Sequence, residues 1–343
     1  MNAQLHNINK DFEESIRPEL SVVIPLYNEY EVLPLLFSRL LKALDPLKIV
    51  YEVIFVDDGS IDGSGEYIVD LAASSVVVKA IRLSRNFGKE AALAAGLKQS
   101  AGSATIILDA DLQDPPELIP EMLSAWHKGA DIVCMKRRCR EGESMTKRFS
   151  AHVFYRLLNH ISHVNIPEDT GDFRLMSRRS LDALNQLPER NRYTKGLFAW
   201  VGFPTHVIDY DREPRAAGVS KWDYFDLMAL ALEGVTSFSV TPLKWMTTFG
   251  LITAILGVIF GAWIVLKTLF LGSEVQGYPS LIAMMTFLGG MQLLCIGVVG
   301  EYVGKTYFEA KQRPLYFIKD VIDGSNSNKN ISNQNKSSVH ATE

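Results

Sequence analysis

The sequence predicts an α/β domain built on a mostly parallel sheet, followed by a transmembrane hairpin of two helices. Three observations predict this architecture. Short apolar runs alternate with helix-length segments between Leu20 and Met135. Polar clusters directly follow these runs, and ligands of parallel sheets bind at the carboxyl ends of the strands. Two later segments, Met246–Leu266 and Val275–Gly300, contain no charged residue and are each long enough to cross a hydrocarbon core.

Strands and helices are expected in alternation along the first part of the chain. Short apolar runs predict strands at Leu20–Pro25, Tyr51–Val56, Val76–Leu83, Ala104–Leu108 and Asp131–Met135. Helices are predicted for residues 32–44, 65–73, 89–99 and 117–128, the last of which is opened by Pro115-Pro116. Strands that alternate with helices of this length imply a mostly parallel sheet covered on both faces.

The expected organisation has five parts. A polar extension (1–19) precedes the α/β domain (20–221), and an amphipathic helix (222–243) is expected to lie along the membrane surface or to pack on the globular part. Two spans at about 246–268 and 278–300 lie within 244–304, for which two buried core helices are the alternative. The remaining 305–343 form a tail, expected to be disordered from about Gly324.

The charges around the two spans predict their orientation. Lysines and arginines cluster before the first span and after the second, whereas the connection between the spans offers only Lys267 and Glu274. This bias, together with the polar first seventeen residues, predicts a hairpin with the α/β domain and both termini in the cytoplasm. Glycines in both spans would allow packing into a homo-oligomer.

The composition excludes some classes of function. The formal net charge of −4 gives no indication of nucleic-acid binding. Cys134, Cys139 and Cys295 lack the spacing of zinc ligands, and we interpret them as reduced structural thiols.

The stretch Asp109-Ala-Asp111-Leu-Gln113 is the strongest functional signal. It follows a buried strand, and acidic side chains two residues apart at a strand end face the same way. Such carboxylates suit one hard cation, Mg²⁺ or Mn²⁺, beside a diphosphate that completes its shell. A solvated acidic turn is the alternative.

Three other segments add polar groups to the same edge of the sheet. Asp57-Asp58-Gly59-Ser60 offers carboxylates to a ribose or a base, although an ordinary turn explains it as well. Ser84–Lys89 opens a helix whose N-terminus suits an anion, for which helix capping is the alternative. Asp172 would orient or deprotonate an attacking group, or form a salt bridge to an arginine such as Arg174.

Basic residues form a second pole of the expected site. They would bind phosphate opposite the acidic cluster, although each alone is more often a solvated surface charge. They are Arg137, Arg138, Arg148, Arg212, Arg215 and Lys221. The last of them belongs to Gly218-Val-Ser220-Lys221-Trp222, a flexible loop with an aromatic residue suited to the membrane interface.

Many ordered motifs resemble those of one known family. The main ones are Pro25-Leu-Tyr-Asn-Glu29, Asp57-Asp-Gly-Ser60, Ser84-Arg-Asn-Phe-Gly-Lys89, Asp109-Ala-Asp-Leu-Gln-Asp-Pro115 and Gly171-Asp-Phe-Arg-Leu-Met176. Together they resemble family 2 glycosyltransferases of the Rossmann-like GT-A fold. Within that family they are similar to the polyprenyl-phosphate branch, which includes dolichyl-phosphate mannose synthases and bactoprenol glucosyltransferases. The resemblance covers about Leu20 to Lys319. The sequence contains no Gln-x-x-Arg-Trp, the signature of processive synthases.

With the residue chemistry above, the resemblance implies a complete site. The expected nucleotide-sugar residues are Pro25, Tyr27, Glu29, Asp57, Lys89 and Asp109, and the expected metal ligands are Asp109, Asp111 and Gln113. Catalysis is expected from Asp111, Arg137 and Asp172. Lipid phosphate and diphosphate are expected to bind Arg137, Arg148, Arg215, Ser220 and Lys221.

The resemblance also implies a reaction and a place in the cell. One hexose, glucose from UDP-glucose by preference, would pass with inversion to undecaprenyl phosphate at the cytoplasmic face of the inner membrane. Another nucleotide sugar is the alternative within the same class: mannose, galactose, an N-acetylhexosamine or an aminoarabinose derivative. A non-catalytic membrane scaffold, or a component that translocates lipid-linked sugar, is the alternative from another class.

Overall fold

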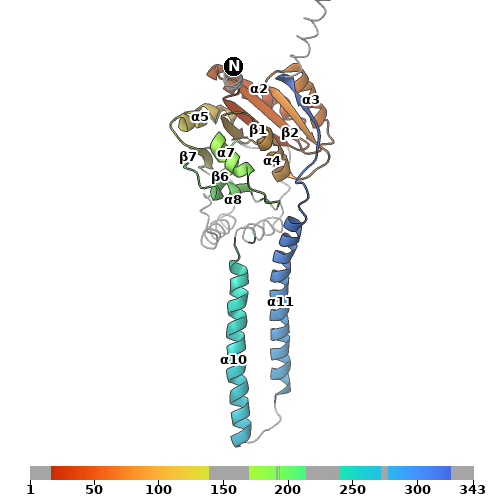
Figure 1. Cartoon of the computed structure of the whole chain (residues 1–343), viewed down its shortest axis with the longest axis vertical. Helices are drawn as coiled ribbons and strands as arrows, with labels where there is room; N and C mark the ends of the chain where they lie inside the picture. Colours follow the sequence, from red (N-terminus) through yellow and green to blue (C-terminus); the bar gives the residue numbers. More distant parts are fainter. Residues whose placement is uncertain are drawn as a thin grey trace, which may run out of the picture. The chain divides into compact units, whose positions relative to one another are not determined.

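The computed structural model describes residues 17–138, 170–190, 192, 194–213, 236, 239–271 and 277–325. The chain separates into two compact units. The first contains the α/β domain together with the segment from Pro314 onward, and the second contains the two long apolar helices (Figure 1).

The described strands of the first unit form one eight-stranded sheet. In the order β7-β5-β6-β4-β1-β2-β3-β8 they are Thr205–Tyr210, Ile132–Arg137, Thr170–Ser177, Ala104–Ile107, Leu20–Leu26, Tyr51–Asp57, Val78–Leu83 and Ile318–Asp323. Strands β1 to β5 and β7 run in one direction, and β6 and β8 run in the other. The predicted fold class, an α/β domain with a mostly parallel sheet, is therefore confirmed.

Helices cover both faces of this sheet. They are α2 (Leu33–Leu44), α3 (Ser64–Ser74), α4 (Lys89–Gln99), α5 (Ile119–His127), α7 (Arg178–Asn185) and α8 (Thr194–Trp200). Alternate residues of β1, such as Val22 and Ile24, enter one buried core with α2, α3 and α5. On the opposite face α4 packs very closely, because a Cβ atom on Gly96 would lie 2.4 Å from Val23 Cγ1.

Strand β6 has the largest effect on the site. It lies antiparallel between β4 and β5, with Ile107 and Cys134 both opposite Arg174. Because β6 runs against its neighbours, its first residues lie at the edge where β4 and β5 end. This reversal carries Asp172 to the end of the strand that delivers Asp109. No strand was predicted here from the sequence.

The C-terminal segment corrects the expectation of a tail for 305–343. Helix α11 continues to Ala310, and residues 318–323 then form β8, which pairs antiparallel with β3. Arg82 on β3 donates to both carboxylate oxygens of Asp320, at 2.9 and 2.7 Å. This strand was not predicted, because the alternating run Ile-Lys-Asp-Val-Ile-Asp is short, charged and distant in sequence from its partner strand.

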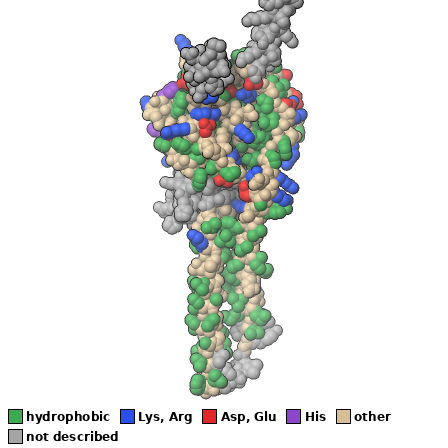
Figure 2. Space-filling model, in the orientation of Figure 1, with side chains coloured by type: hydrophobic (Ala, Val, Ile, Leu, Met, Phe, Trp, Pro, Cys, Tyr) green, Lys and Arg blue, Asp and Glu red, His purple; other side chains and the backbone are tan. Residues whose placement is uncertain are grey.

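The second unit consists of two long helices, α10 (Thr241–Leu271) and α11 (Tyr278–Ala310). Each is long and apolar enough to cross a membrane, over Thr241–Ile264 and Met284–Ala310 respectively. Hydrophobic side chains remain exposed along both helices (Figure 2), so these are not the core helices that were the alternative.

The apolar windows of these helices differ in position from the predicted spans. The first window starts earlier than 246–268, and the second ends later than 278–300. At the cytoplasm-directed end predicted from the charges, the Tyr302 hydroxyl donates to the Ser239 carbonyl at 2.5 Å. The amphipathic helix expected over 222–243 falls mostly outside the described residues.

Candidate functional site

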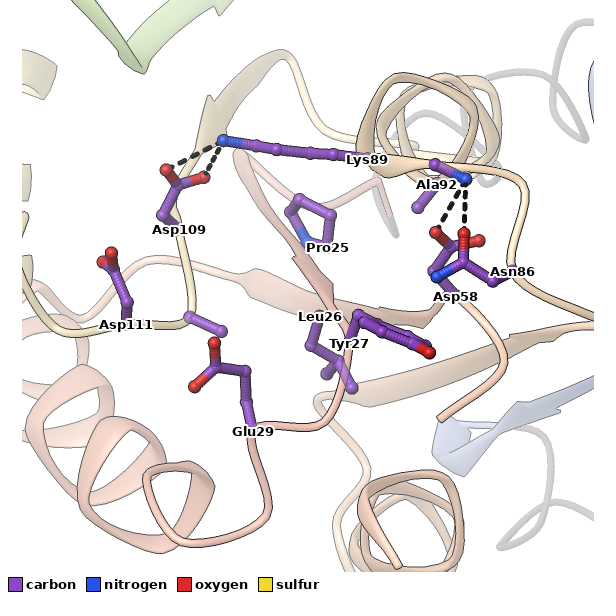
Figure 3. Close-up of a pocket in the computed structure, with 12 residues that line it drawn as sticks. Pro25, Leu26, Tyr27, Glu29, Asp58, Asn86, Lys89, Ala92, Asp109 and Asp111 are labelled. Carbon is purple, nitrogen blue, oxygen red and sulfur yellow. Dashed lines mark hydrogen bonds and ion pairs between the residues drawn. The ribbon is translucent and has the colours of Figure 1, made fainter. Parts of the chain in front are cut away.

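A pocket of about 280 Å³ opens at the carboxyl ends of β1, β2 and β4, where ligands of parallel sheets bind. It is lined by Pro25, Leu26, Tyr27, Glu29, Asp58, Asn86, Gly88, Lys89, Ala92, Asp109, Ala110 and Asp111. Asp109, Asp111 and Glu29 lie on one side and Asp58 and Asn86 on the other, while Lys89 reaches across (Figure 3). The clusters predicted after β1, β2 and β4 thus meet in one place.

The acidic loop after β4 places two carboxylates in this pocket. Asp109 and Asp111 both line it, as the sequence pattern predicted. Between Asp111 and Gln113, Leu112 has φ 58°, a left-handed conformation that is rare for a bulky residue and is typical of functional loops. The Gln113 N–H donates to Asp111 Oδ1 at 3.2 Å, and its carbonyl accepts from Glu213 N at 3.0 Å. Gln113 itself does not line the pocket.

Lys89 joins two of the predicted site carboxylates. Its Nζ lies 2.7 Å from Asp109 Oδ1 and 2.6 Å from Asp172 Oδ2. Partial burial opposes the charge of the ammonium, but the two carboxylates raise the pKa of Lys89 above its usual range. Burial likewise opposes ionisation of Asp172, yet Lys89 and Lys195 hold the pKa of that carboxyl well below its usual range.

The partner of Asp172 differs from the arginine considered in the sequence analysis. Arg174 instead donates from Nη2 to the Gly171 carbonyl at 2.6 Å and stacks on Phe198, with its Cζ 3.8 Å from the ring centre. Arg174 is buried and supports the start of β6, where Asp172 directly follows Gly171. The charge that meets Asp172 is that of Lys89.

The carboxylate oxygens that line the pocket are suitable ligands for a hard divalent cation. Asp109, Asp111 and Glu29 line it with carboxylate oxygens, the ligands that Mg²⁺ and Mn²⁺ prefer. Among the described residues, no group of three His, Cys, Asp or Glu side chains is placed to hold a metal alone. A cation on Asp109 and Asp111 would therefore need further oxygen ligands, which a bound diphosphate has.

The two aspartates after β2 have different environments. Asp58 lines the pocket and accepts from the backbone N–H groups of Phe87 and Gly88 at 2.7 and 2.8 Å. Burial raises its pKa, and these two hydrogen bonds oppose the rise. Asp57, the predicted nucleotide residue, instead accepts from Ser60 N at 3.0 Å and does not line the pocket.

The segment after β1 contributes two of the predicted nucleotide-sugar residues. Pro25 and Tyr27 line the pocket, and Tyr27 remains 41% exposed, so its ring is accessible to a ligand. Asn28 has φ 57°, which bends the chain after Tyr27. The Asn28 and Glu29 N–H groups donate to the hydroxyls of Ser60 and Ser64 at 2.9 and 3.0 Å, which ties this turn to the one after β2.

The predicted basic pole is described only in part. Arg137 lies at the end of β5 beside Gly171, where a Cβ atom would be 3.1 Å from its Nη2. It does not line the pocket. Arg148, Arg215, Ser220 and Lys221 lie outside the described residues, so their roles stay predictions.

Two acidic residues of the site were not predicted. Asp114 is buried, accepts from the Tyr210 hydroxyl and lies 3.6 Å from Arg212 Nε, so it joins the acidic loop to the end of β7. Glu90 lies beside Lys89 and accepts from the Thr194 hydroxyl of α8. Both adjoin predicted motifs, and that adjacency was the available signal.

Glu90 should make stability depend on pH. Burial, reinforced by the charge of Asp172, raises its pKa to about 7 from 4.5. The folded state then binds the proton more tightly, so stability falls as the pH rises from about 4.5 to 7. We expect Glu90→Gln to raise the free energy of unfolding at pH 8 by up to about 3 kcal/mol, and to leave it unchanged at pH 4.

Thermal unfolding of the full chain at both pH values measures this effect. Glu121→Gln on the exposed face of α5 is the matched control and should change neither melting temperature. An equal gain for Glu90→Gln at pH 4 and pH 8 would contradict the assignment, because it would not reflect ionisation.

Two family models match the chain, and each of its two units contains part of a match. The model of glycosyl transferase family 2 matches residues 21–184, and that of the GtrB C-terminal hairpin matches residues 241–306. The bactoprenol glucosyl transferase of Shigella phage SfV is 46% identical, over 88% of this chain and 98% of that protein. A prophage bactoprenol glucosyl transferase homolog of Escherichia coli is 45% identical, over 88% and 99%. An uncharacterized glycosyltransferase of Synechocystis is 50% identical, over 88% and 95%.

Proposed function

Because the chain belongs to glycosyl transferase family 2, in the polyprenyl-phosphate branch with a GtrB C-terminal hairpin, we propose that it transfers glucose from UDP-glucose to undecaprenyl phosphate. The products would be UDP and a polyprenyl-phosphate sugar with inverted anomeric configuration. The observation that carries the proposal is the ion pair of Lys89 with Asp109 and Asp172, which joins the expected diphosphate site to the expected catalytic aspartate.

Binding of the donor would use the groups that line the pocket. Tyr27 and Pro25 offer a flat wall for the base, and the Asp58 side of the pocket would accept hydrogen bonds from a ribose or base. Asp109 and Asp111 would hold Mg²⁺ or Mn²⁺ beside the diphosphate, where such a cation supplies Lewis-acid stabilisation of the leaving group. The ammonium of Lys89 adds a second positive charge at the same end of the pocket.

The acceptor phosphate is already anionic at neutral pH, so it needs no strong base to attack the anomeric carbon. A general base works best when its pKa is close to the operating pH, and that of Asp172 is far below its usual range. Asp172 would therefore position Lys89 and balance charge rather than remove a proton. Arg137 and the basic residues outside the described part would bind the phosphates, and positioning would supply most of the rate.

The hairpin would hold the enzyme at the inner membrane. Its two helices have the length and composition of membrane spans, and the basic residues that flank them favour cytoplasmic termini. A polyprenyl phosphate presents its charged group at that interface. Because the chain is a glycosyltransferase, the non-catalytic scaffold is no longer an alternative. The donor sugar is identified by a comparison of nucleotide sugars.

Incubation of the purified full chain with undecaprenyl phosphate, Mg²⁺ and a panel of labelled nucleotide sugars tests the proposal. Label should enter the lipid fraction from UDP-glucose alone and depend on the divalent cation. Incorporation from a different donor would overturn the choice of glucose and retain the reaction class. The absence of lipid product from every donor would overturn the proposed acceptor.

A further inference from the structure

The loop formed by residues 84–88 makes one wall of the pocket. It connects β3 to α4, and two of its residues, Asn86 and Gly88, line the cavity directly before Lys89. Any displacement of this loop would therefore move this wall of the pocket. Contacts on two sides hold this loop in place.

On its inner side the loop rests on the turn after β2. The carboxylate of Asp58 accepts from Phe87 N and Gly88 N. Gly59 has φ +73°, and a Cβ atom there would lie 2.6 Å from the Arg85 carbonyl carbon. The two backbones are thus in direct contact, which only glycine permits at this position.

On its outer side the loop meets the strand that follows the apolar hairpin. The Ser84 N–H donates to the Phe317 carbonyl at 2.9 Å. The ring centroids of Phe87 and Phe317 lie 6.3 Å apart, and the Arg85 guanidinium carbon lies over the Phe87 ring, 4.1 Å from its centroid. Phe317 immediately precedes β8, where the register of the pairing with β3 shifts between Arg82 and Leu83.

Strand β8 has its own anchors, which do not involve the loop. Arg82 forms a bidentate salt bridge with Asp320, and Lys79 Nζ lies 3.4 Å from Asp323 Oδ2. Phe317 thus adjoins a strand whose charged anchors do not include its ring. Truncation of the ring should affect the loop without unpairing the strand.

We infer that β8 is a positioning element for the pocket, and that Phe317 holds residues 84–88 in the conformation in which they meet Asp58. The segment after the apolar hairpin thereby contributes to donor binding without contacting the donor. The choice of UDP as the binding probe and the kinetic measurements rest on the proposed function. The contact of Phe317 with the loop does not depend on it.

The test compares Phe317→Ala with Val321→Ala in the full detergent-solubilised chain. Both side chains are exposed and apolar and belong to the same segment, at 57% and 44% exposure, but Phe317 contacts the loop. Hydrogen exchange of the peptide that contains Phe87 and Gly88 should accelerate about five-fold in Phe317→Ala and stay unchanged in the control. Phe317→Tyr should restore wild-type exchange.

Binding and kinetics separate positioning from general damage. We expect Phe317→Ala to weaken UDP binding and raise the KM for the nucleotide sugar about five-fold, with kcat, the KM for the lipid and the melting temperature unchanged. Unchanged exchange at Phe87 and Gly88, or equal acceleration in Val321→Ala, would overturn the inference. If wild-type protein does not bind UDP, the proposed donor is wrong, and the exchange measurement still decides the role of Phe317.

Discussion

Replacement of Asp111 by Asn should abolish turnover and leave the fold intact. Asn has the same shape and keeps an oxygen that can accept from Gln113 N, but it lacks the charge that a divalent cation requires. Because this carboxylate would hold the cation that neutralises the leaving diphosphate, we expect kcat to fall at least about 100-fold. The melting temperature should stay within a few degrees of wild type.

Activity, metal binding and stability should be measured on the same preparation. Binding of Mn²⁺, followed by electron paramagnetic resonance in the presence of UDP, should weaken together with the loss of kcat. Asp70→Asn on the exposed surface of α3 is the matched control and should bind Mn²⁺ normally. A fully active Asp111→Asn protein would refute the metal assignment.

Replacement of Lys89 by Met should cause a loss of similar size for a different reason. Met keeps the length of the side chain but leaves Asp109 and Asp172 without the ammonium between them. Two facing carboxylates then repel each other, and the expected catalytic aspartate loses its partner. We expect kcat to fall about 100-fold. Because Lys89 is 45% exposed, we expect a stability loss of only about 1–2 kcal/mol, less than for a fully buried pair.

Two further variants identify the cause of this loss. Lys98→Met, at the exposed other end of α4, should keep full activity. Addition of Asp172→Asn to Lys89→Met should cost less stability than the sum of the single changes, because it removes one of the repelling charges. Strict additivity, measured by thermal unfolding, would show that the two side chains do not interact.

Much of the site was predictable because it follows local rules. The run that precedes Asp109 reads as a buried strand, and a parallel sheet gathers the ends of its strands at one edge. This rule, together with the resemblance to family 2 glycosyltransferases, placed Pro25, Tyr27, Glu29, Lys89, Asp109 and Asp111 in one site, and all six line the pocket. The apolar helices were equally clear, since a long uncharged segment can be recognised without knowledge of its partners.

The misplaced or missed residues depend on contacts between distant segments. Asp57 and Asp58 are adjacent in sequence, and their alternating directions send only Asp58 into the pocket. Lys89 and Asp172 are 83 residues apart, and their contact exists because β6 enters the sheet in reverse. Arg82 and Asp320 are 238 residues apart, and no local pattern signals that pairing.

The α/β class, the apolar hairpin and the identity of the chemical groups were predictable from the sequence, because periodicity and strand-end motifs are properties of short segments. The folded sheet was needed to show which carboxylates contact Lys89, which of two neighbouring aspartates faces the cavity, and that the strand after the hairpin lies against the loop of the pocket wall. Strand direction and pairing order are set by the packing of the whole sheet, and short strands of mixed polarity do not encode their partners locally.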